Sequence, residues 1–219
     1  MTEEGRLREA ICRVGASLHA RGYVHATAGN ISARLADGFL ITPTDACLGT
    51  LDPARLARVG LDGVQTAGEP ASKTLALHRR LYAASPEAGC VLHTHSTHLV
   101  ALTLQGVWSA DDIVPPITPY FVMKVGHVPL IPYARPGDPA VADAVVARVA
   151  AHAARGLALR AVMLERLGPV VWQRTPEAAS AVLEELEETA RLWLMCDPRP
   201  APLGEPQIEE LRRQFGAAW

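Results

Sequence analysis

The stretch Gly89-Cys90-Val91-Leu92-His93-Thr94-His95-Ser96 is a short apolar run that ends in two histidines one residue apart. A short apolar run of this kind is typical of a buried strand, so we predict a strand over residues 89–95. On a strand, residues i and i+2 share a face and lie about 6.6 Å apart along the chain. His93 and His95 are therefore expected to project together. Such a pair either holds a divalent metal or hydrogen-bonds at a sheet edge.

The composition is that of an ordinary globular protein. The chain has 219 residues, of which 49% are hydrophobic and 20% charged, which suits one domain with a full core. The net charge is −2, and the absence of a basic stripe argues against nucleic acid as a partner. The acidic start lacks the pattern of a secretory signal, and no stretch is apolar enough to span a membrane. We therefore predict a cytoplasmic protein with no membrane partner.

Hydrophobic spacing and turn residues outline the elements around this strand. We predict an α/β fold in one domain, residues 1–219, built on a mixed sheet. Turns are expected at Asp37-Gly38 and Gly168-Pro169, a helix cap at Ser72, and a proline-rich linker over residues 197–206. Helices are predicted over residues 3–21, 73–84, 139–153, 176–195 and 207–216, and strands over 31–35, 39–42, 128–131, 161–164 and 170–172.

Several motifs in chain order resemble the class II aldolase/adducin family. Residues 27–32, TAGNIS, resemble that family's TSGNIS turn, and residues 41–44, ITPT, resemble its ITPTG segment. Residues 70–78, PASKTLALH, resemble its PSxE…H helix, and the HTHS sequence matches its HxHS strand. Longer segments such as residues 115–133, PPITPYFVMKVGHVPLIPY, resemble the 3-oxo-tetronate 4-phosphate decarboxylase branch. The resemblance runs from about residue 5 to 215.

The resemblance implies a three-layer α/β/α domain and a homotetramer with active sites between subunits. It also implies a divalent metal, commonly zinc, held by three histidines, of which His93 and His95 match two. The implied chemistry is that of a lyase of carbohydrate metabolism, in which the metal stabilises an enediolate. In the decarboxylase branch, a phosphorylated 3-oxo sugar acid reaches that enediolate by losing CO₂.

The substrate's phosphate is expected on exposed amides and hydroxyls, because amides at turns and at helix N-termini are natural anion sites. The residues that match are Gly29, Asn30, Thr44, Ser72 and Lys73. Taken singly, each also fits a simpler role as a turn residue, a helix cap or a solvated lysine. We expect this ordered set to bind the phosphate.

The sequence departs from the family at two active-site positions. Leu167 stands where the third metal histidine is expected, and leucine has no donor atom. Thr74 replaces the acid/base glutamate, and an alcohol is not an effective general base near neutral pH. Tyr120 is the residue we expect to return a proton, although it also fits a packed aromatic beside a proline turn.

The missing third ligand leaves several outcomes open. His98, His127 or Glu165 could act as a substitute, water or substrate could fill the place, or the chain could bind no metal. We expect weakened or altered metal binding. Besides decarboxylation, the alternatives are aldolase-type cleavage, a repurposed enzyme with a different substrate, and a degenerate non-catalytic protein that acts in binding or assembly.

Overall fold

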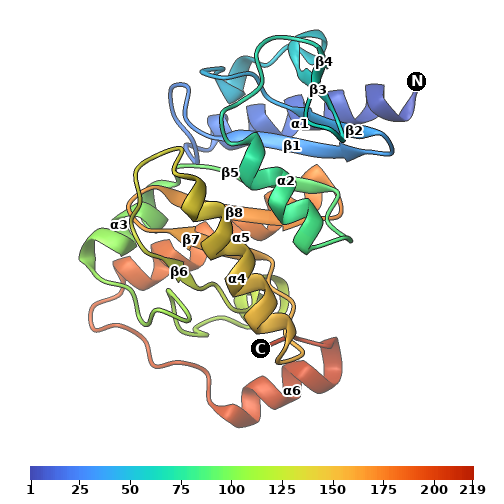
Figure 1. The fold of residues 1–219 in the computed structure, drawn as a ribbon. Helices are drawn as coiled ribbons and strands as arrows, with labels where there is room; N and C mark the ends of the chain where they lie inside the picture. Colours follow the sequence, from blue (N-terminus) through green and yellow to red (C-terminus); the bar gives the residue numbers. More distant parts are fainter.

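The structure, a computed structural model, describes residues 1–219. Its centre is an eight-stranded sheet in the order β4-β3-β2-β1-β5-β8-β7-β6 (Figure 1). Neighbouring strands run antiparallel, except for the parallel pair β6 and β7. The strands are β1 Asn30–Leu35, β2 Gly38–Ile41, β3 Ala57–Gly60, β4 Gln65–Ala67, β5 Cys90–His93, β6 Leu130–Ile131, β7 Ala161–Leu164 and β8 Gly168–Gln173. The predicted mixed sheet is confirmed, and β5 lies near its middle.

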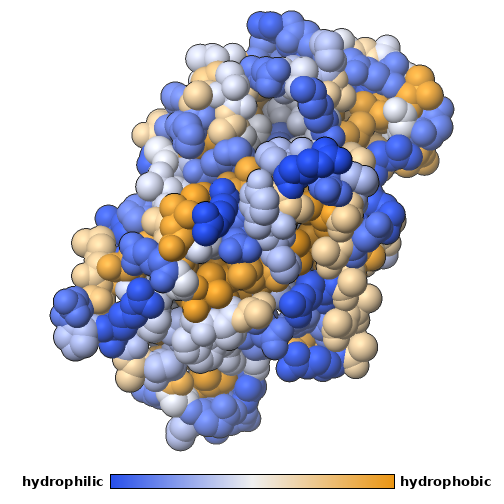
Figure 2. Space-filling model, turned by 60° about the vertical axis from the view of Figure 1, so that its left-hand side comes forward, coloured by the Kyte–Doolittle hydropathy of each residue, from blue (hydrophilic) through white to orange (hydrophobic).

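Helices cover both faces of the sheet, which makes the three layers of an α/β/α fold (Figure 1). One face carries α1 (Glu3–Ala20), α3 (Thr97–Gln105) and α5 (Pro176–Met195), and the other carries α2 (Leu75–Ala84) and α4 (Pro139–Ala153). A last helix, α6 (Glu205–Phe215), packs on the π-helical turn Phe121–Val125. None of the helices combines the length and the apolar character that a membrane crossing requires. Figure 2 shows apolar surface across the middle of one face, among hydrophilic side chains.

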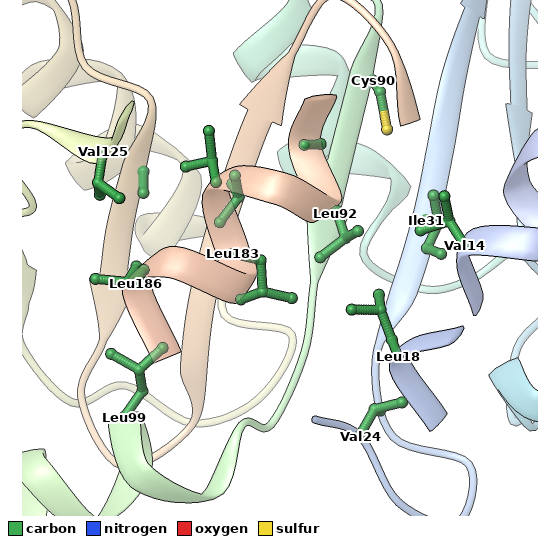
Figure 3. Packing of buried hydrophobic residues seen from close by; sticks show 14 of the residues in the cluster. Val14, Leu18, Val24, Ile31, Cys90, Leu92, Leu99, Val125, Leu183 and Leu186 are labelled. Atoms are coloured by element: carbon green, nitrogen blue, oxygen red, sulfur yellow. The ribbon is translucent and has the colours of Figure 1, made fainter. Parts of the chain in front are cut away.

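The alternation of side chains along β5 decides which way its histidine points. Cys90 and Leu92 belong to the larger apolar cluster, on the face where Leu183 of α5 lies (Figure 3). Val91 belongs to the smaller cluster, beneath α2 and α4. Because successive strand residues point to opposite faces, His93 projects to the same side as Val91. The candidate site is therefore on the α2 and α4 side of the sheet.

Two predicted helix starts differ from the structure. The helix predicted from residue 73 begins at Leu75, and Ser72 is not its cap, because the N-cap is Thr74 without a side-chain bond to the helix. The Ser72 N–H donates to the carbonyl of Thr42, 3.1 Å away. This bond ties Ser72 to the residue that follows β2. The C-terminal helix begins at Glu205, inside the predicted linker, because the Gln207 side chain accepts a bond from the Gly204 N–H.

Two predicted turns are displaced. The hairpin turn is Ala36-Asp37 rather than Asp37-Gly38, since Gly38 already pairs with Leu35. Gly168 and Pro169 lie in β8, and the turn before them covers residues 165–167. A Cβ on Gly168, whose φ is +143°, would lie 1.9 Å from the carbonyl oxygen of Thr94. Only glycine permits this approach, which brings the turn against the backbone that carries the histidines.

The predicted strand over residues 89–95 is too long at its end. β5 stops at His93, so His95 lies beyond the sheet. The chain turns away there because the Thr94 and Ser96 hydroxyls hydrogen-bond each other at 2.6 Å and Ser96 donates to the carbonyl of Tyr23. His95 therefore does not share with His93 the strand face that the sequence predicts, although the two rings still lie 5.0 Å apart.

Candidate active site

His93 is buried, and a hydrogen bond fixes its ring. Its Nδ1 lies 2.8 Å from the carbonyl oxygen of Pro169. A carbonyl can only accept, so Nδ1 carries the proton and Nε2 keeps a free lone pair. A hydrogen bond from the far nitrogen to a backbone carbonyl is the usual way in which proteins orient a metal-binding histidine.

The rings of His93 and His95 lie with their centroids 5.0 Å apart at an interplanar angle of 64°. Two imidazoles on a tetrahedral Zn²⁺, with Zn–N bonds of about 2.0–2.1 Å, would have centroids about 5 Å apart. The separation therefore suits a shared divalent cation. The pair can occupy two positions of a tetrahedral coordination shell, although His93 lies in β5 and His95 lies beyond its end.

Both histidines are kept neutral, the form that binds metals. Burial lowers the pKa of His93 to about 4, and the neighbouring His95 lowers it further in the same sense, while the Pro169 carbonyl opposes the shift. Burial also lowers the pKa of His95, with a smaller contribution from His25. Protons therefore compete little for these nitrogens near neutral pH.

His93 opens on a cleft of about 780 Å³, counting the space open to solvent. Both departures from the family pattern line the same cleft, since Thr74 and Leu167 face it beside His93. Leu167 also packs against the smaller apolar cluster. The wall of the cleft is therefore apolar where a third imidazole is expected and carries a neutral hydroxyl where a carboxylate is expected.

Charged side chains stand at the rim of this cleft. Lys73 and Arg135 line it together with Glu165. The Glu165 carboxylate accepts a hydrogen bond from the Tyr133 N–H at 2.9 Å. Asp138 also lines the cleft, and its carboxylate lies 3.6 Å from Nε of Arg135. Lys73 is therefore the cation at the rim that makes no ion pair and can meet an anionic substrate directly.

The residues expected at the phosphate are divided between places. Gly29, with φ +82°, packs so closely on His93 that a Cβ there would lie 2.8 Å from the His93 carbonyl oxygen. Asn30 pairs with His93 across β1 and β5, and its buried Oδ1 has no partner. Ser72 does not line the cleft, but its hydroxyl lies 3.0 Å from the hydroxyl of Thr74, which does. Thr44 lines a separate cavity.

Of the three suggested substitutes for the third ligand, only Glu165 shares the cleft with His93. His98 is held by Glu187, a buried carboxylate that lies 2.8 Å from its Nδ1 and also accepts the His98 N–H. His127 is held by Asp112 and stacks on Trp219 with centroids 4.5 Å apart. No three His, Cys, Asp or Glu side chains are grouped closely enough to hold a metal ion by themselves.

Tyr120 lies away from the cleft, with 61% of its surface exposed at the start of the π-helical turn. It does not line the cleft of its own chain. A role in proton return therefore requires that a second copy of the chain present Tyr120 to this site.

Two histidines outside the predicted site residues lie near the site. His78 is fully buried, its Nδ1 lies 2.7 Å from the Ser32 hydroxyl, and its Nε2 has no partner. Burial, with a further effect of His93, lowers its pKa to about 3. The ring of His25 lies 6.4 Å from that of His95. The only available signal was that His25 stands a few residues before the Gly29-Asn30 turn, which packs on His93.

The fold agrees with comparisons to known proteins. Residues 9–194 match the family described as Class II Aldolase and Adducin N-terminal domain. The chain belongs to the class II aldolase/adducin family.

Similar proteins indicate which branch of the family the chain resembles. The 3-oxo-tetronate 4-phosphate decarboxylase of Cupriavidus necator is 59% identical over 224 residues, which cover 100% of both chains. The decarboxylase of the same name from Escherichia coli K12 is 42% identical over 95% of this chain and 96% of its own. The crystal structure of YgbL from Escherichia coli matches with a TM-score of 0.86 at 40% identity, over 96% of this chain and 100% of that one.

Proposed function

We propose that this chain is a carbon–carbon lyase that decarboxylates 3-oxo-tetronate 4-phosphate. The observation that carries the proposal is the cleft itself, in which a neutral, oriented imidazole on His93 adjoins the cations of Lys73 and Arg135. Such a substrate is anionic at both ends and has a carbonyl between them. The 59% identity to the Cupriavidus necator decarboxylase supports the same reaction.

The reaction has a simple balance of atoms and electrons. The bond between the carboxylate carbon C1 and C2 breaks, CO₂ leaves, and the electron pair passes toward the C3 carbonyl. One proton then returns to C2. A divalent cation held by His93 and His95, in our proposal Zn²⁺, would supply Lewis-acid stabilisation for negative charge on the substrate oxygens.

The protein's own residues bind and orient the substrate. Lys73 lines the cleft and is proposed to hold the phosphate, because ammonium groups are usual partners of that anion. A contribution from Gly29, Asn30, Ser72 and Thr44 stays a prediction from the family resemblance, because none of these four residues lines the cleft and Thr44 lines a separate cavity. We propose Arg135 for the carboxylate, since its guanidinium can form two parallel hydrogen bonds with a carboxylate.

Thr74 favours decarboxylation over aldol cleavage. Aldol cleavage requires a base to remove a hydroxyl proton, and the cleft offers an alcohol at the place where the family has a carboxylate. Decarboxylation generates its electron pair by losing CO₂ and then needs only a proton. Water or Tyr120 of a second copy is proposed to provide it, in a homotetramer with sites between subunits. Exposed apolar side chains such as Leu104, Trp108 and Tyr133 are compatible with such contacts.

The test is CO₂ release from 3-oxo-tetronate 4-phosphate by the purified protein with Zn²⁺, Mn²⁺ or Fe²⁺. We expect turnover that the unphosphorylated acid does not support and that His93→Ala abolishes. If none of the three metals supports turnover and the substrate does not shift the melting temperature, the protein is instead a non-catalytic member of the family. Turnover of another 3-oxo acid phosphate instead would indicate a repurposed enzyme. The cytoplasmic location, the role in carbohydrate metabolism and the single domain over residues 1–219 remain predictions.

A further inference from the structure

We propose that a cavity lined by Arg160, Arg174 and Trp172 binds a phosphate group. The volume of this cavity is about 550 Å³, counting the space open to solvent. No residue lines both this cavity and the cleft that contains His93. The cavity is therefore a second site, and the proposal does not rest on the proposed function.

The cavity lies at the opposite end of strands β5 and β8 from His93. Gln173 of β8 lines the cavity and pairs with Cys90, the first residue of β5, whereas His93 is the last residue of that strand. The backbone beside the cavity is closely packed, because a Cβ on Gly89 would lie 2.2 Å from the carbonyl oxygen of Arg174. This close approach holds the backbone of Arg174 at the cavity.

The two arginines give the cavity positive charge that no carboxylate neutralises. Neither Arg160 nor Arg174 forms an ion pair in the structure. Arg160 donates from Nη1 to the carbonyls of Met123 and Lys124, at 2.9 Å and 2.7 Å, and these bonds leave its Nε and Nη2 free. Burial lowers the pKa of Arg160, because its guanidinium loses water there, and a bound anion would offset that loss. Guanidinium groups bind phosphate through two parallel hydrogen bonds.

Trp172 provides a buried donor that lacks an acceptor. It lines the cavity with only 2% of its surface exposed, and its Nε1–H has no hydrogen-bond partner. A buried donor without an acceptor is unfavourable, and few are found in folded proteins. The indole N–H can only donate, and an ionised phosphate oxygen accepts. A phosphate in the cavity would therefore satisfy this group.

Glu87 indicates what the phosphate is attached to. It is the only carboxylate that lines the cavity, and it also lines a second groove, together with Val149 and Leu157. A carboxylate repels phosphate, but it accepts hydrogen bonds from hydroxyl groups. A small phosphomonoester with hydroxyl groups therefore fits, with its phosphate on the arginines and its hydroxyls toward Glu87.

The experiment is a calorimetric titration of inorganic phosphate and of glycerol 3-phosphate into Lys73→Ala protein, whose active-site cleft lacks the lysine proposed for the substrate. We expect both probes to bind. Adding Arg174→Gln should weaken both by at least about 10-fold, because it removes a charged donor. Arg174 is exposed, so this change leaves the packing intact. Arg213→Gln alters an exposed arginine of α6 that does not line the cavity and should have no effect.

A second variant tests the buried donor. Trp172→Phe removes the N–H and keeps an aromatic ring, and it should weaken phosphate binding by about 5-fold or more. Tighter binding of glycerol 3-phosphate than of phosphate would identify the ligand as an ester, and equal binding would identify it as free phosphate. No binding of either probe at millimolar concentration would overturn the proposal. So would an affinity that Arg174→Gln leaves unchanged.

Discussion

His93 at the end of β5 and Leu167 in the turn before β8 line the same cleft. His93 lies opposite Val170 in the register of β5 and β8, and Leu167 lies in the turn that enters β8. Gly168 lets that turn pass within contact distance of Thr94. An imidazole at position 167 would therefore face the space beside His93, and the chain places an isobutyl group there instead.

Leu167→His should increase the affinity for Zn²⁺ by about 10-fold or more, because it adds a nitrogen donor to a cleft that already contains an oriented imidazole. Calorimetric titration of Zn²⁺ into chelator-treated protein measures the change. Leu167→Ala is the control, since it removes the same apolar contacts without adding a donor. Equal gains in both variants would show that access to the cleft, rather than ligation, limits binding.

Thr74→Glu should create or increase aldol cleavage of a ketose 1-phosphate, because it supplies a general base to the cleft. General acid–base groups typically contribute about 10²–10⁴-fold in rate. CO₂ release from the 3-oxo acid should change much less, since that reaction requires no base. Thr74→Gln provides a matched side chain that cannot take up a proton. If it raises aldol cleavage as much as Thr74→Glu does, the base is not the reason.

The double change Thr74→Glu with Leu167→His tests whether the site has decayed or been adapted. If the natural chain turns over slowly because it lacks these groups, the double variant should exceed it in both CO₂ release and aldol cleavage. Steady-state rates at saturating Zn²⁺ give the comparison. A loss of existing CO₂ release would instead show that Thr74 and Leu167 shape the pocket for its present substrate.

Lys73→Ala should lower kcat/KM for the phosphorylated substrate by about 10-fold to 100-fold, since a hydrogen bond to a charged group contributes about 1.5–3 kcal/mol. The loss should appear mainly in KM. Lys124→Ala changes the other lysine of the chain and should have little effect, because Lys124 does not line the cleft. An unchanged KM in Lys73→Ala would remove Lys73 from the phosphate site.

His78 predicts a specific dependence of stability on pH. Burial holds its folded pKa at about 3, whereas an unfolded histidine titrates near 6.5. The unfolded chain therefore binds more protons below about pH 6.5, and the free energy of unfolding should fall as the pH drops, by up to about 1.4 kcal/mol per pH unit from this group. Above about pH 6.5 the group adds no dependence.

Urea unfolding of wild type and His78→Gln between pH 8 and pH 4.5 checks this prediction. The variant lacks the titrating ring, so the stability difference between the two proteins should shift in favour of the variant as the pH falls. Parallel pH profiles would show that His78 does not titrate as its burial indicates.

The fold was more predictable than the site. Helices α1, α4 and α5 and strand β7 lie close to their predicted bounds, because amphipathic spacing and caps such as Asp138 and Thr175 act locally. The end of β5 was not predictable in this way. It depends on the Ser96 bond to the Tyr23 carbonyl, which joins residues 73 positions apart.

The same reason limits prediction of the site. The sequence identified His93, Thr74 and Leu167, and the structure brings all three to one cleft. The sequence could not show that Thr44 lines a different cavity, nor that His25 lies beside His95. Both depend on how distant segments pack, which local spacing does not encode.

The central claim is that His93 and His95 share a divalent cation. The most direct measurement is anomalous scattering at the zinc absorption edge from crystals soaked in Zn²⁺. We predict a single strong peak per chain between the two rings, within about 2.0–2.1 Å of a nitrogen of each. An empty position between His93 and His95 in crystals soaked in millimolar Zn²⁺ would contradict the claim.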